Sequence, residues 1–416
     1  MKIKTLILLL LACGLTTMST AQCPTSSIEL NSQAAIDNFL INYPGCTVIP
    51  AGVNITIDGL SDNITNVDGL SQITTISGDI DILNNSTLTN VDGLSQLTSV
   101  GGDLRIQTNS ALTNVDGLNQ LTSVAGGVWI LFNSALTNVD GLSQITSIGG
   151  ILWIRGNDAL TNIDGLNQLT SIGESLEIAD NSALMNVDGL SQLTSIIGGL
   201  FVTNNGILTN LNGLSELTSA GGNLWVIDNA ALTNVDGLSQ LTSVEEELRI
   251  LNNGTLTSLN GFNQLTSIGK NLRIESNSQL SQCCALCPLL AANAADPTII
   301  GGTITIKDNL TGCNSVTDIN ACSTCLVGTS MPEYALVQLN VYPNPAQNIL
   351  HFQCESSKNE LVDFTIKNYL GQQFIQNQIY TNQFVLVDIS DYPAGLYFLN
   401  VLKGDESVSR LFSVSR

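Results

Sequence analysis

The three tryptophans of this chain occupy the same position of a repeated sequence. Each lies between two apolar residues, as in Val128-Trp129-Ile130. The corresponding residues of successive repeats are Asp81, Arg105, Trp129, Trp153, Glu177, Phe201, Trp225, Arg249 and Arg273. Aromatic rings and guanidinium groups bind ligands by stacking and hydrogen bonding, and a row of them on a surface is typical of an interaction site. We therefore predict a ligand-binding strip formed by Trp129, Trp153, Phe201, Trp225, Arg105, Arg249 and Arg273.

Catalytic residue types are scarce in the repeats. The sole histidine, His351, lies outside them, so the repeats contain no Ser-His or Cys-His nucleophile pair. The sequence also has no phosphate-binding loop and no HExxH motif. Some solenoid enzymes degrade polysaccharides with Asp and Arg, but in loops that interrupt the repeat, and this repeat is uninterrupted. We expect a non-enzymatic protein without a cofactor, and a polysaccharide-degrading enzyme is the alternative.

Aspartate recurs at a second position, where a row of carboxylates could bind calcium. Asn212 and Asn260 replace it in two repeats, and asparagine keeps the hydrogen bonds of a turn while it loses the charge. The position therefore favours a turn-capping role over a calcium site. The aspartates are Asp68, Asp92, Asp116, Asp140, Asp164, Asp188 and Asp236.

Asparagine occupies a third position without exception. An amide both donates and accepts hydrogen bonds, so one side chain can satisfy the backbone of its own turn and of a neighbouring repeat. We expect this row to be structural. Its members are Asn85, Asn109, Asn133, Asn157, Asn181, Asn205, Asn229, Asn253 and Asn277.

The repeat that positions these residues is 24 residues long, as in 88–111. A fixed period of this size is typical of a solenoid in which each repeat forms one coil. The alternation Leu104-Arg105-Ile106 predicts a strand whose Arg105 points outward. The glycine that recurs from Gly69 to Gly261 is assigned to turn chemistry. Stacked coils then form a parallel sheet with strands about 4.8 Å apart and an inward column of Leu104, Val128, Leu152, Leu176, Leu200, Leu224 and Leu248.

The run I-x-G-x-L-x-I-x-x-N-x-x-L-x-x-(V/L)-x-G-L resembles the receptor L-domain repeat, a relative of leucine-rich repeats. The resemblance covers about residues 24–325 and is specific, because nine coils repeat it. It implies a right-handed parallel β-helix that is used for binding rather than for catalysis.

The first 21 residues have the pattern of a secretory signal peptide, with Lys2 and Lys4 before a short apolar core and Ala21 at a small-residue cleavage site. A lipoprotein signal at Cys13 is the alternative. The solenoid domain (22–325) begins with a cap (22–50), in which Ile36, Phe39 and Leu40 predict one face of a short helix. It ends with a second cap (279–325), which holds a predicted helix (279–293) and one late coil.

Cysteines occur in both caps and are absent from the repeats between them. In an exported protein we expect disulfides, including one between Cys23 and Cys46. Zinc bound by Cys284-x-x-Cys287 together with Cys322-x-x-Cys325 is the alternative. We expect Cys354 to remain a thiol, and we expect disulfides at Cys23, Cys46, Cys283, Cys284, Cys287, Cys313, Cys322 and Cys325.

After a linker (326–335), alternating segments such as Val362-Asp363-Phe364-Thr365-Ile366 predict a small β-sandwich. The segments 341–346 (VYPNPA) and 393–397 (PAGLY) resemble the type A C-terminal sorting domain of type IX secretion, over residues 336–416. Arg410 and Arg416 replace the usual lysine-rich end. The resemblance implies recognition by the type IX secretion machinery, export across the outer membrane, and removal of the domain with release or anchoring at the surface.

The charge of the chain restricts its partners. A net charge of −22 with only 13 basic residues excludes nucleic acid as a partner, and no further apolar segment is long enough for membrane insertion. We thus predict an all-β, secreted or outer-surface protein: a β-solenoid with disulfide-bonded helical caps and a C-terminal β-sandwich. The strip is predicted to bind an extended glycan or a surface protein. The alternatives are cross-strand stacking that only stabilises the sheet and a purely structural surface spacer.

Overall fold

The computed structural model describes residues 23–322, 336–356, 359, 361–368, 372–403 and 406–415. The chain forms two compact units, Met1–Cys325 and Leu326–Arg416, and each is described by itself. The predicted signal peptide and linker lie outside the described residues. Within the described ranges, no helix is both long and apolar enough to cross a lipid bilayer.

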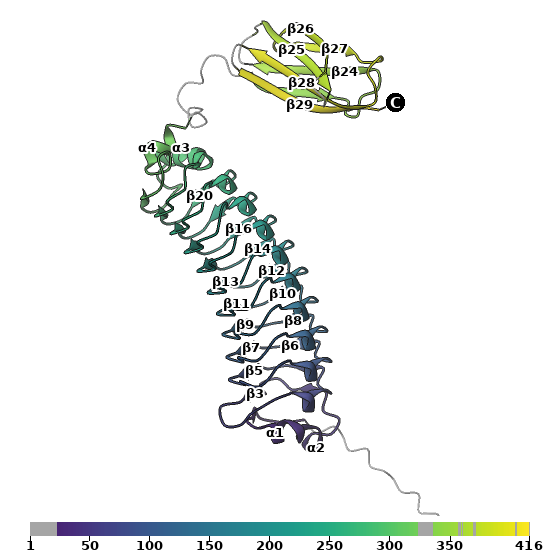
Figure 1. The fold of residues 1–416 in the computed structure, drawn as a ribbon, viewed down its shortest axis with the longest axis vertical. Coiled ribbons are helices and arrows are strands. Elements are labelled where there is room, and N and C mark those ends of the chain that lie inside the picture. The colour runs from purple at the N-terminus through teal and green to yellow at the C-terminus, as the bar shows by residue number, and fades with distance from the viewer. Residues whose placement is uncertain are drawn as a thin grey trace, which may run out of the picture. The chain divides into compact units, whose positions relative to one another are not determined.

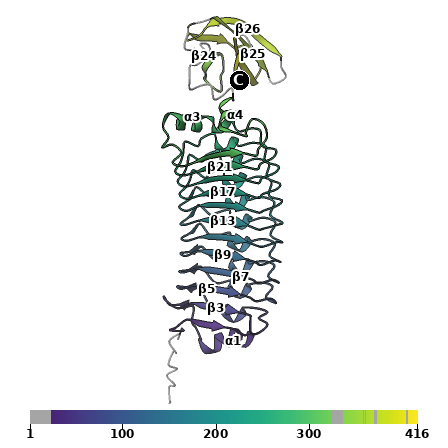
Figure 2. The ribbon, with the colours of Figure 1, turned by 90° about the vertical axis from the view of Figure 1, so that its left-hand side faces the viewer.

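The first unit is a stack of coils whose longest side is a parallel sheet of 12 strands, here called sheet A. Figure 1 shows the coils one above another, and Figure 2 shows sheet A with its strands side by side. The predicted solenoid and its parallel sheet are confirmed. The strands of sheet A are β1 (Ile28–Leu30), β3 (Ile55–Asp58), β5 (Ile80–Leu83), β7 (Leu104–Gln107), β9 (Val128–Leu131), β11 (Leu152–Arg155), β13 (Leu176–Ala179), β15 (Leu200–Thr203), β17 (Leu224–Ile227), β19 (Leu248–Leu251), β21 (Leu272–Glu275) and β22 (Ile304–Lys307).

The register of sheet A follows the 24-residue period. Leu152 pairs with Val128 on one side and with Leu176 on the other. Every member of the predicted inward column, from Leu104 to Leu248, is fully buried. The predicted register is therefore confirmed, and with it the outward direction of the residue between the two core positions of each strand.

Two further sides close each coil, which the sequence pattern did not reveal. A second parallel sheet of ten two-residue strands runs along the stack, from β2 (Val48–Ile49) and β4 (Thr75–Ile76) to β20 (Ser267–Ile268). Single turns of 3₁₀ helix, from η1 (Asp68–Leu70) to η9 (Asn260–Phe262), form the third side. Because the chain bends after every few residues, apolar residues three apart all reach the same narrow core.

The recurrent glycine of the 3₁₀ turn is required by close packing between coils. None of the nine glycines from Gly69 to Gly261 has a positive φ angle, so turn conformation does not explain them. A Cβ atom at Gly141 would lie 1.8 Å from the carbonyl oxygen of Val115 in the preceding coil. The turn-chemistry assignment is thus wrong at this position, because the constraint comes from the neighbouring coil.

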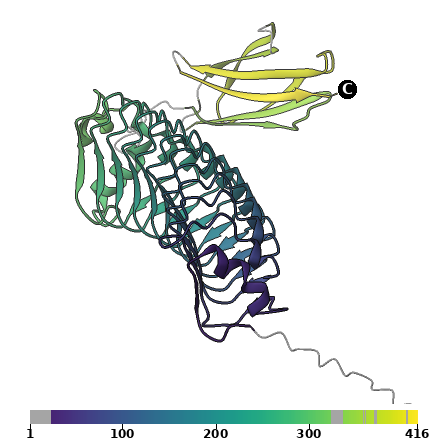
Figure 3. The ribbon, with the colours of Figure 1, turned by 60° about the horizontal axis from the view of Figure 1, so that its bottom comes forward.

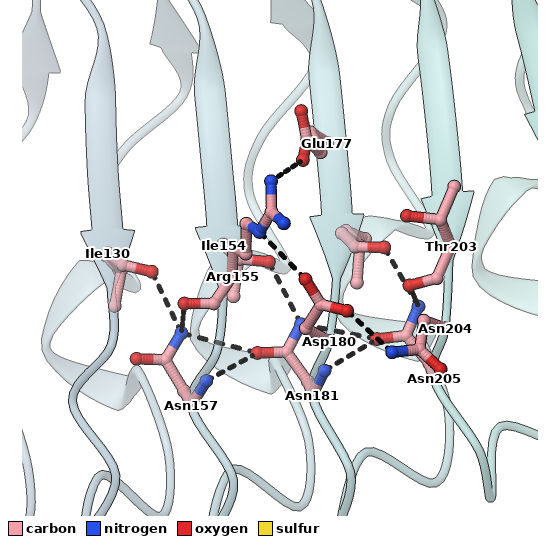
Figure 4. A network of polar contacts seen from close by, with 11 residues as sticks. Ile130, Ile154, Arg155, Asn157, Glu177, Asp180, Asn181, Thr203, Asn204 and Asn205 are labelled. Atoms are coloured by element: carbon pink, nitrogen blue, oxygen red, sulfur yellow. Dashed lines mark hydrogen bonds and ion pairs between the residues drawn. The ribbon is translucent and has the colours of Figure 1, made fainter.

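The asparagine row is a buried ladder of hydrogen bonds, as predicted. All nine side chains from Asn85 to Asn277 are fully buried. The Oδ1 atom of Asn157 accepts from the backbone N–H of Asn133 at 3.0 Å, while its Nδ2 donates to the carbonyl of Ile130 at 2.8 Å. Figure 4 shows this pattern continuing through Asn181 and Asn205. Each amide therefore joins its own coil to both neighbours.

The aspartate row lies on the exposed side of the 3₁₀ turns. The turn is capped by the asparagine two residues earlier, since the Oδ1 atom of Asn138 accepts from the backbone N–H of Asp140 at 3.1 Å. This corrects the predicted capping role of the aspartate side chain. Partial burial and repulsion from Asp116 and Asp164 raise the pKa of the Asp140 carboxyl group. No group of three or more His, Cys, Asp or Glu suited to a metal ion occurs in the described part of the chain.

The N-terminal cap contains two short helices, α1 (Gln33–Asp37) and α2 (Phe39–Asn42), below the first coils in Figure 1. Ile36 and Phe39 are buried as predicted, but Leu40 is 39% exposed. The two helices are separate segments that meet at Asn38, and the predicted buried face does not extend to Leu40. A disulfide joins Cys23 to Cys46, as predicted.

The C-terminal cap contains η10 (Cys284–Leu286), α3 (Cys287–Ala295), β22 and α4 (Val316–Asn320). Two disulfides hold it, Cys283–Cys313 and Cys284–Cys322, and Cys287 is also disulfide-bonded. Disulfides use the sulfur atoms that the zinc alternative needed, so that alternative is excluded. Cys325 lies outside the described residues.

The second unit is a small sandwich of two antiparallel sheets, as predicted, and Figure 3 shows its two layers. Phe352 and Phe364, one from each sheet, meet in the core with ring centroids 5.0 Å apart. Cys354 is a buried thiol in the same core. The three-stranded sheet consists of β23 (Leu336–Tyr342), β24 (Ile349–Ser356) and β27 (Phe384–Asp388), and the other of β26 (Gln373–Tyr380), β25 (Leu361–Asn368), β28 (Gly395–Lys403) and β29 (Glu406–Val414).

Candidate functional site

The predicted strip lies on the outer face of sheet A, the face turned toward the viewer in Figure 2. Its residues are paired in register across strands, with Trp129 beside Trp153 and Phe201 beside Trp225. Their side chains are half-buried, because neighbours only one strand spacing apart shelter one another. The sheet therefore brings the four aromatic residues into one row.

The aromatic residues of the predicted strip form two separate pairs, each between neighbouring strands. The rings of Trp129 and Trp153 meet edge to face at 5.3 Å between centroids, with an interplanar angle of 83°. Phe201 and Trp225 repeat this arrangement at 5.1 Å and 82°. In each pair the edge of one ring thus packs against the face of the other. The two rings together form an angled aromatic surface on the sheet. We call the two pairs cradle 1 (Trp129 and Trp153) and cradle 2 (Phe201 and Trp225).

Glu177 separates the two cradles, since its strand pairs with those of Trp153 and Phe201. Figure 4 shows Arg155 between the carboxylates of Glu177 and Asp180, with contacts of 3.6 Å and 2.8 Å. Burial raises the pKa of the Glu177 carboxyl group, and the Trp153 and Arg155 side chains offset only part of this effect. A carboxylate is therefore placed at the centre of the strip, in partly desolvated surroundings.

The arginines at the ends of the strip are engaged with protein groups. The Arg105 guanidinium lies 5.0 Å from the centroid of the Trp129 ring and forms ion pairs with Asp81 and Asp103. Arg249 lies 4.3 Å from the Trp225 ring and 2.6 Å from a Glu247 oxygen. These contacts hold the outer tryptophan of each cradle in place, whereas the sequence suggested donors available to a ligand.

Arg273, the last residue of the predicted strip, lies beyond the cradles. Its Nε atom contacts a Glu275 oxygen at 2.7 Å, and this hydrogen bond holds the pKa of the Glu275 carboxyl group below its ordinary value. Its strand pairs directly with that of Arg249, so Arg273 lies two coils beyond Trp225 of cradle 2. The structure thus places it in the row but outside the aromatic part.

Glycines lie beneath one ring of each cradle. A Cβ atom at Gly127 would be 2.6 Å from Nε1 of Trp129, and one at Gly199 would be 2.6 Å from Cζ of Phe201. Other coils carry larger residues at this position, such as Ile151 and Asn223. The space that these two rings occupy is therefore open only where the glycines occur.

Hollows adjoin both cradles. One of about 330 Å³ is lined by Phe201, Trp225, Glu177, Thr203 and Asn223. The other, of about 270 Å³, combines Trp129 with the carboxylates of Asp103 and Glu174 and with glycine-rich turns. Each hollow thus offers an aromatic surface together with hydrogen-bonding groups. Carboxylates and amides of this kind suit a ligand that carries hydroxyl groups.

Phe132, which directly follows β9, is an exposed aromatic residue that the sequence analysis missed. It has a φ of 55°, is 49% exposed, and covers Gly156, where a Cβ atom would lie 2.5 Å from its ring. Most coils have Asn, Asp, Thr or Ser at this position, for example Asn84 and Asp180. A bulky residue in the left-handed region is strained. The sequence signal that could have revealed it is that two neighbouring coils, with Phe132 and Gly156, both lack the usual polar residue at this position.

Comparisons with known proteins identify two segments. Residues 45–123 match the model of the receptor L domain, and residues 340–415 match that of the secretion system C-terminal sorting domain. A search of curated proteins gives no match. The sorting domain marks proteins that type IX secretion exports and that are attached at the cell surface or released from it. The chain is therefore a secreted or surface protein that combines a receptor L domain-like solenoid with a secretion-system sorting domain.

Proposed function

We propose that the solenoid is a non-enzymatic binding module whose strip takes an extended, uncharged glycan. The observation that carries this proposal is the pairing of an aromatic cradle with hydrogen-bonding groups, as in the hollow that Phe201 and Trp225 share with Glu177 and Asn223. A pyranose ring presents apolar C–H groups on its faces and hydroxyl groups at its edge. It therefore matches a site with aromatic faces and amide or carboxylate acceptors.

The charge of the molecule selects among glycans. The chain carries a net charge of −22, and Glu177 stands in the centre of the strip. Since like charges repel most strongly in partly desolvated surroundings, uronate-containing or sulfated polysaccharides are unsuitable ligands. Neutral chains of glucose, mannose, xylose or N-acetylglucosamine fit this surface.

The edge-to-face pairs would also stabilise the sheet without any ligand, and this is the competing explanation. The glycines argue against it, because Gly127 and Gly199 remove side chains that other coils use. Phe132 has a strained backbone conformation and an exposed side chain, and neither feature stabilises the fold. Residues that differ from the consensus of the repeat and do not stabilise the fold are typical of functional surfaces.

The test is binding of the full mature chain to an array of neutral and acidic β-linked oligosaccharides. Trp153→Ala combined with Trp225→Ala should abolish binding while the melting temperature stays nearly unchanged, because both side chains point away from the core. Ile197→Ala, at an apolar residue 70% exposed on another side of the coil, is the matched control and should bind normally. Leu152→Ala should instead destabilise the fold by about 2–5 kcal/mol.

Two results would contradict the proposal. One is the absence of binding to every neutral oligosaccharide, which leaves a protein ligand as the remaining partner for the strip. The other is a loss of thermal stability in the double tryptophan variant as large as that of Leu152→Ala. In that case the aromatic pairs would belong to the scaffold.

A further inference from the structure

The two cradles are copies of one arrangement displaced along the stack. Trp129 and Phe201 occupy equivalent positions three coils apart, and so do Trp153 and Trp225. The glycines beneath the rings, Gly127 and Gly199, have the same separation. The two ring geometries agree within 0.2 Å and 1°. The strip thus contains the same edge-to-face aromatic pair twice.

The displacement is fixed by the solenoid. Parallel strands lie about 4.8 Å apart, so three coils separate equivalent rings by about 14 Å. The intervening coil that carries Glu177 has no insertion, and buried amides tie it to both neighbours, through Asn157 on one side and Asn205 on the other. The spacing between the cradles therefore cannot adapt to a ligand, and the ligand has to match it.

We infer that the strip binds a linear glycan with a regular repeat, which must be long enough to occupy both cradles at once. Because the two sites have a fixed spacing and so select ligand length, we call the strip a two-site ruler. This inference deepens the proposed function and depends on it. Pyranose rings joined by equatorial bonds form an extended ribbon that advances by close to one strand spacing per ring. A chain that lies across the strands places one ring on each coil. The span from Trp129 to Trp225 covers four strand spacings, about 19 Å, and so accommodates about five rings.

The energetic consequence is a step in affinity with ligand length. A trisaccharide can fill one cradle only, because even when it spans from Trp153 to Phe201, two strand spacings apart, it reaches just one ring of each cradle. A pentasaccharide or longer chain occupies both, and its second contact forms within the complex already made. Joining two contacts in this way raises affinity by about 100-fold or more when the spacing fits. Below this length, each added sugar contributes only its own contact.

The experiment uses calorimetric titration of the full mature chain with β-1,4-linked oligomers of glucose and of N-acetylglucosamine, from the disaccharide to the octasaccharide. Affinity should rise steeply between the trisaccharide and the pentasaccharide. Trp225→Ala removes cradle 2 and should reduce pentasaccharide affinity to about the trisaccharide value. Trisaccharide binding at cradle 1 should remain. Oligo-β-1,4-glucuronate of the same lengths has the same equatorial linkages, so it is the charged control and should not bind.

Because the solenoid is built from equal coils, a variant with one extra coil can change the spacing between the cradles. Duplication of residues 160–183 inserts one coil between the cradles and moves them from three coils to four. The affinity step should then shift to chains about one sugar longer, while trisaccharide affinity stays constant. Duplication of residues 232–255 adds one coil beyond Trp225, leaves the cradles three coils apart, and should leave the step unchanged. Both insertions have the same length, so any general effect on folding appears in both.

The outcomes separate the two proposals. Binding whose affinity increases smoothly with length, or a step that stays in place after duplication of 160–183, overturns the ruler and leaves glycan binding intact. No binding of any of these oligomers overturns both. A step that moves with the inserted coil and is absent in Trp225→Ala supports the ruler.

Discussion

Substitution of Asn157 tests whether the buried amide ladder holds the stack together. The side chain is fully buried. Its Oδ1 atom accepts from the backbone N–H of Asn133 at 3.0 Å, and its Nδ2 donates to the carbonyl of Ile130 at 2.8 Å. Asn157→Ala leaves both backbone groups without these partners. Each buried unpaired group costs about 1–3 kcal/mol, so we expect the free energy of unfolding to fall by about 2–6 kcal/mol.

Asn157→Asp separates hydrogen bonding from shape. Aspartate has the same outline, but it replaces the donor with an acceptor that faces the Ile130 carbonyl and the Oδ1 atom of Asn181, which lie 2.8 Å and 3.3 Å from Nδ2. A buried carboxylate beside two acceptors is less stable than an empty site. We therefore expect Asn157→Asp to reduce the free energy of unfolding at pH 7 at least as much as Asn157→Ala.

The assay is urea unfolding of the full mature chain, followed by far-ultraviolet circular dichroism. Asn167→Ser is the matched control, because Asn167 is exposed and equivalent positions carry Ser143 and Ser191; it should change stability by less than about 0.5 kcal/mol. Asn85→Ala should cost less than Asn157→Ala, since Oδ1 of Asn85 has no donor among the described residues. An Asn157→Ala variant as stable as Asn167→Ser would refute the reasoning.

Three further predictions concern packing, charge and disulfides. Gly141→Ala places a Cβ atom 1.8 Å from a backbone oxygen and should cost at least about 3 kcal/mol in urea unfolding, whereas Gly206→Ala, with no atom within 4 Å, should be neutral. Because the Asp140 pKa is raised above 3.8, its charged form destabilises the fold at higher pH. Asp140→Asn should therefore raise the melting temperature by about 1 °C at pH 7, and the difference should disappear below pH 3.8. Replacement of Cys283 and Cys313 by serine opens a loop of 30 residues and should cost about 3.6 kcal/mol by the chain-entropy relation; an unchanged unfolding midpoint would contradict this.

Much of the solenoid could be predicted because its period is regular. The alternation Leu104-Arg105-Ile106 was enough to place a strand, its register and its outward face, all of which the structure confirms. The second sheet and the 3₁₀ turns could not be predicted, since their segments are only two or three residues long. A pattern needs several residues to show a helical or strand period.

The candidate site was harder to predict because it depends on contacts between coils. The sequence placed Trp129 and Trp153 in one row, but their ring angle is set by the space above Gly127. Arg105 pairs with Asp81 on the adjacent strand, and Arg249 pairs with Glu247, directly before its own strand. No spacing rule fixes the directions of these acidic side chains. The role of these aromatic residues in binding stays a prediction.

The amide ladder has a direction, and this direction determines which end of the stack needs a special acceptor. The backbone N–H of each ladder residue donates to the asparagine of the next coil, as Asn133 does to Asn157. A stack that ended at any earlier coil would therefore leave the backbone N–H of its last ladder residue without an acceptor. Only at the last coil does the donor find its acceptor nearby, where the N–H of Asn309 reaches Oδ1 of Asn314 at 3.0 Å. The C-terminal cap thus completes the ladder where the stack ends.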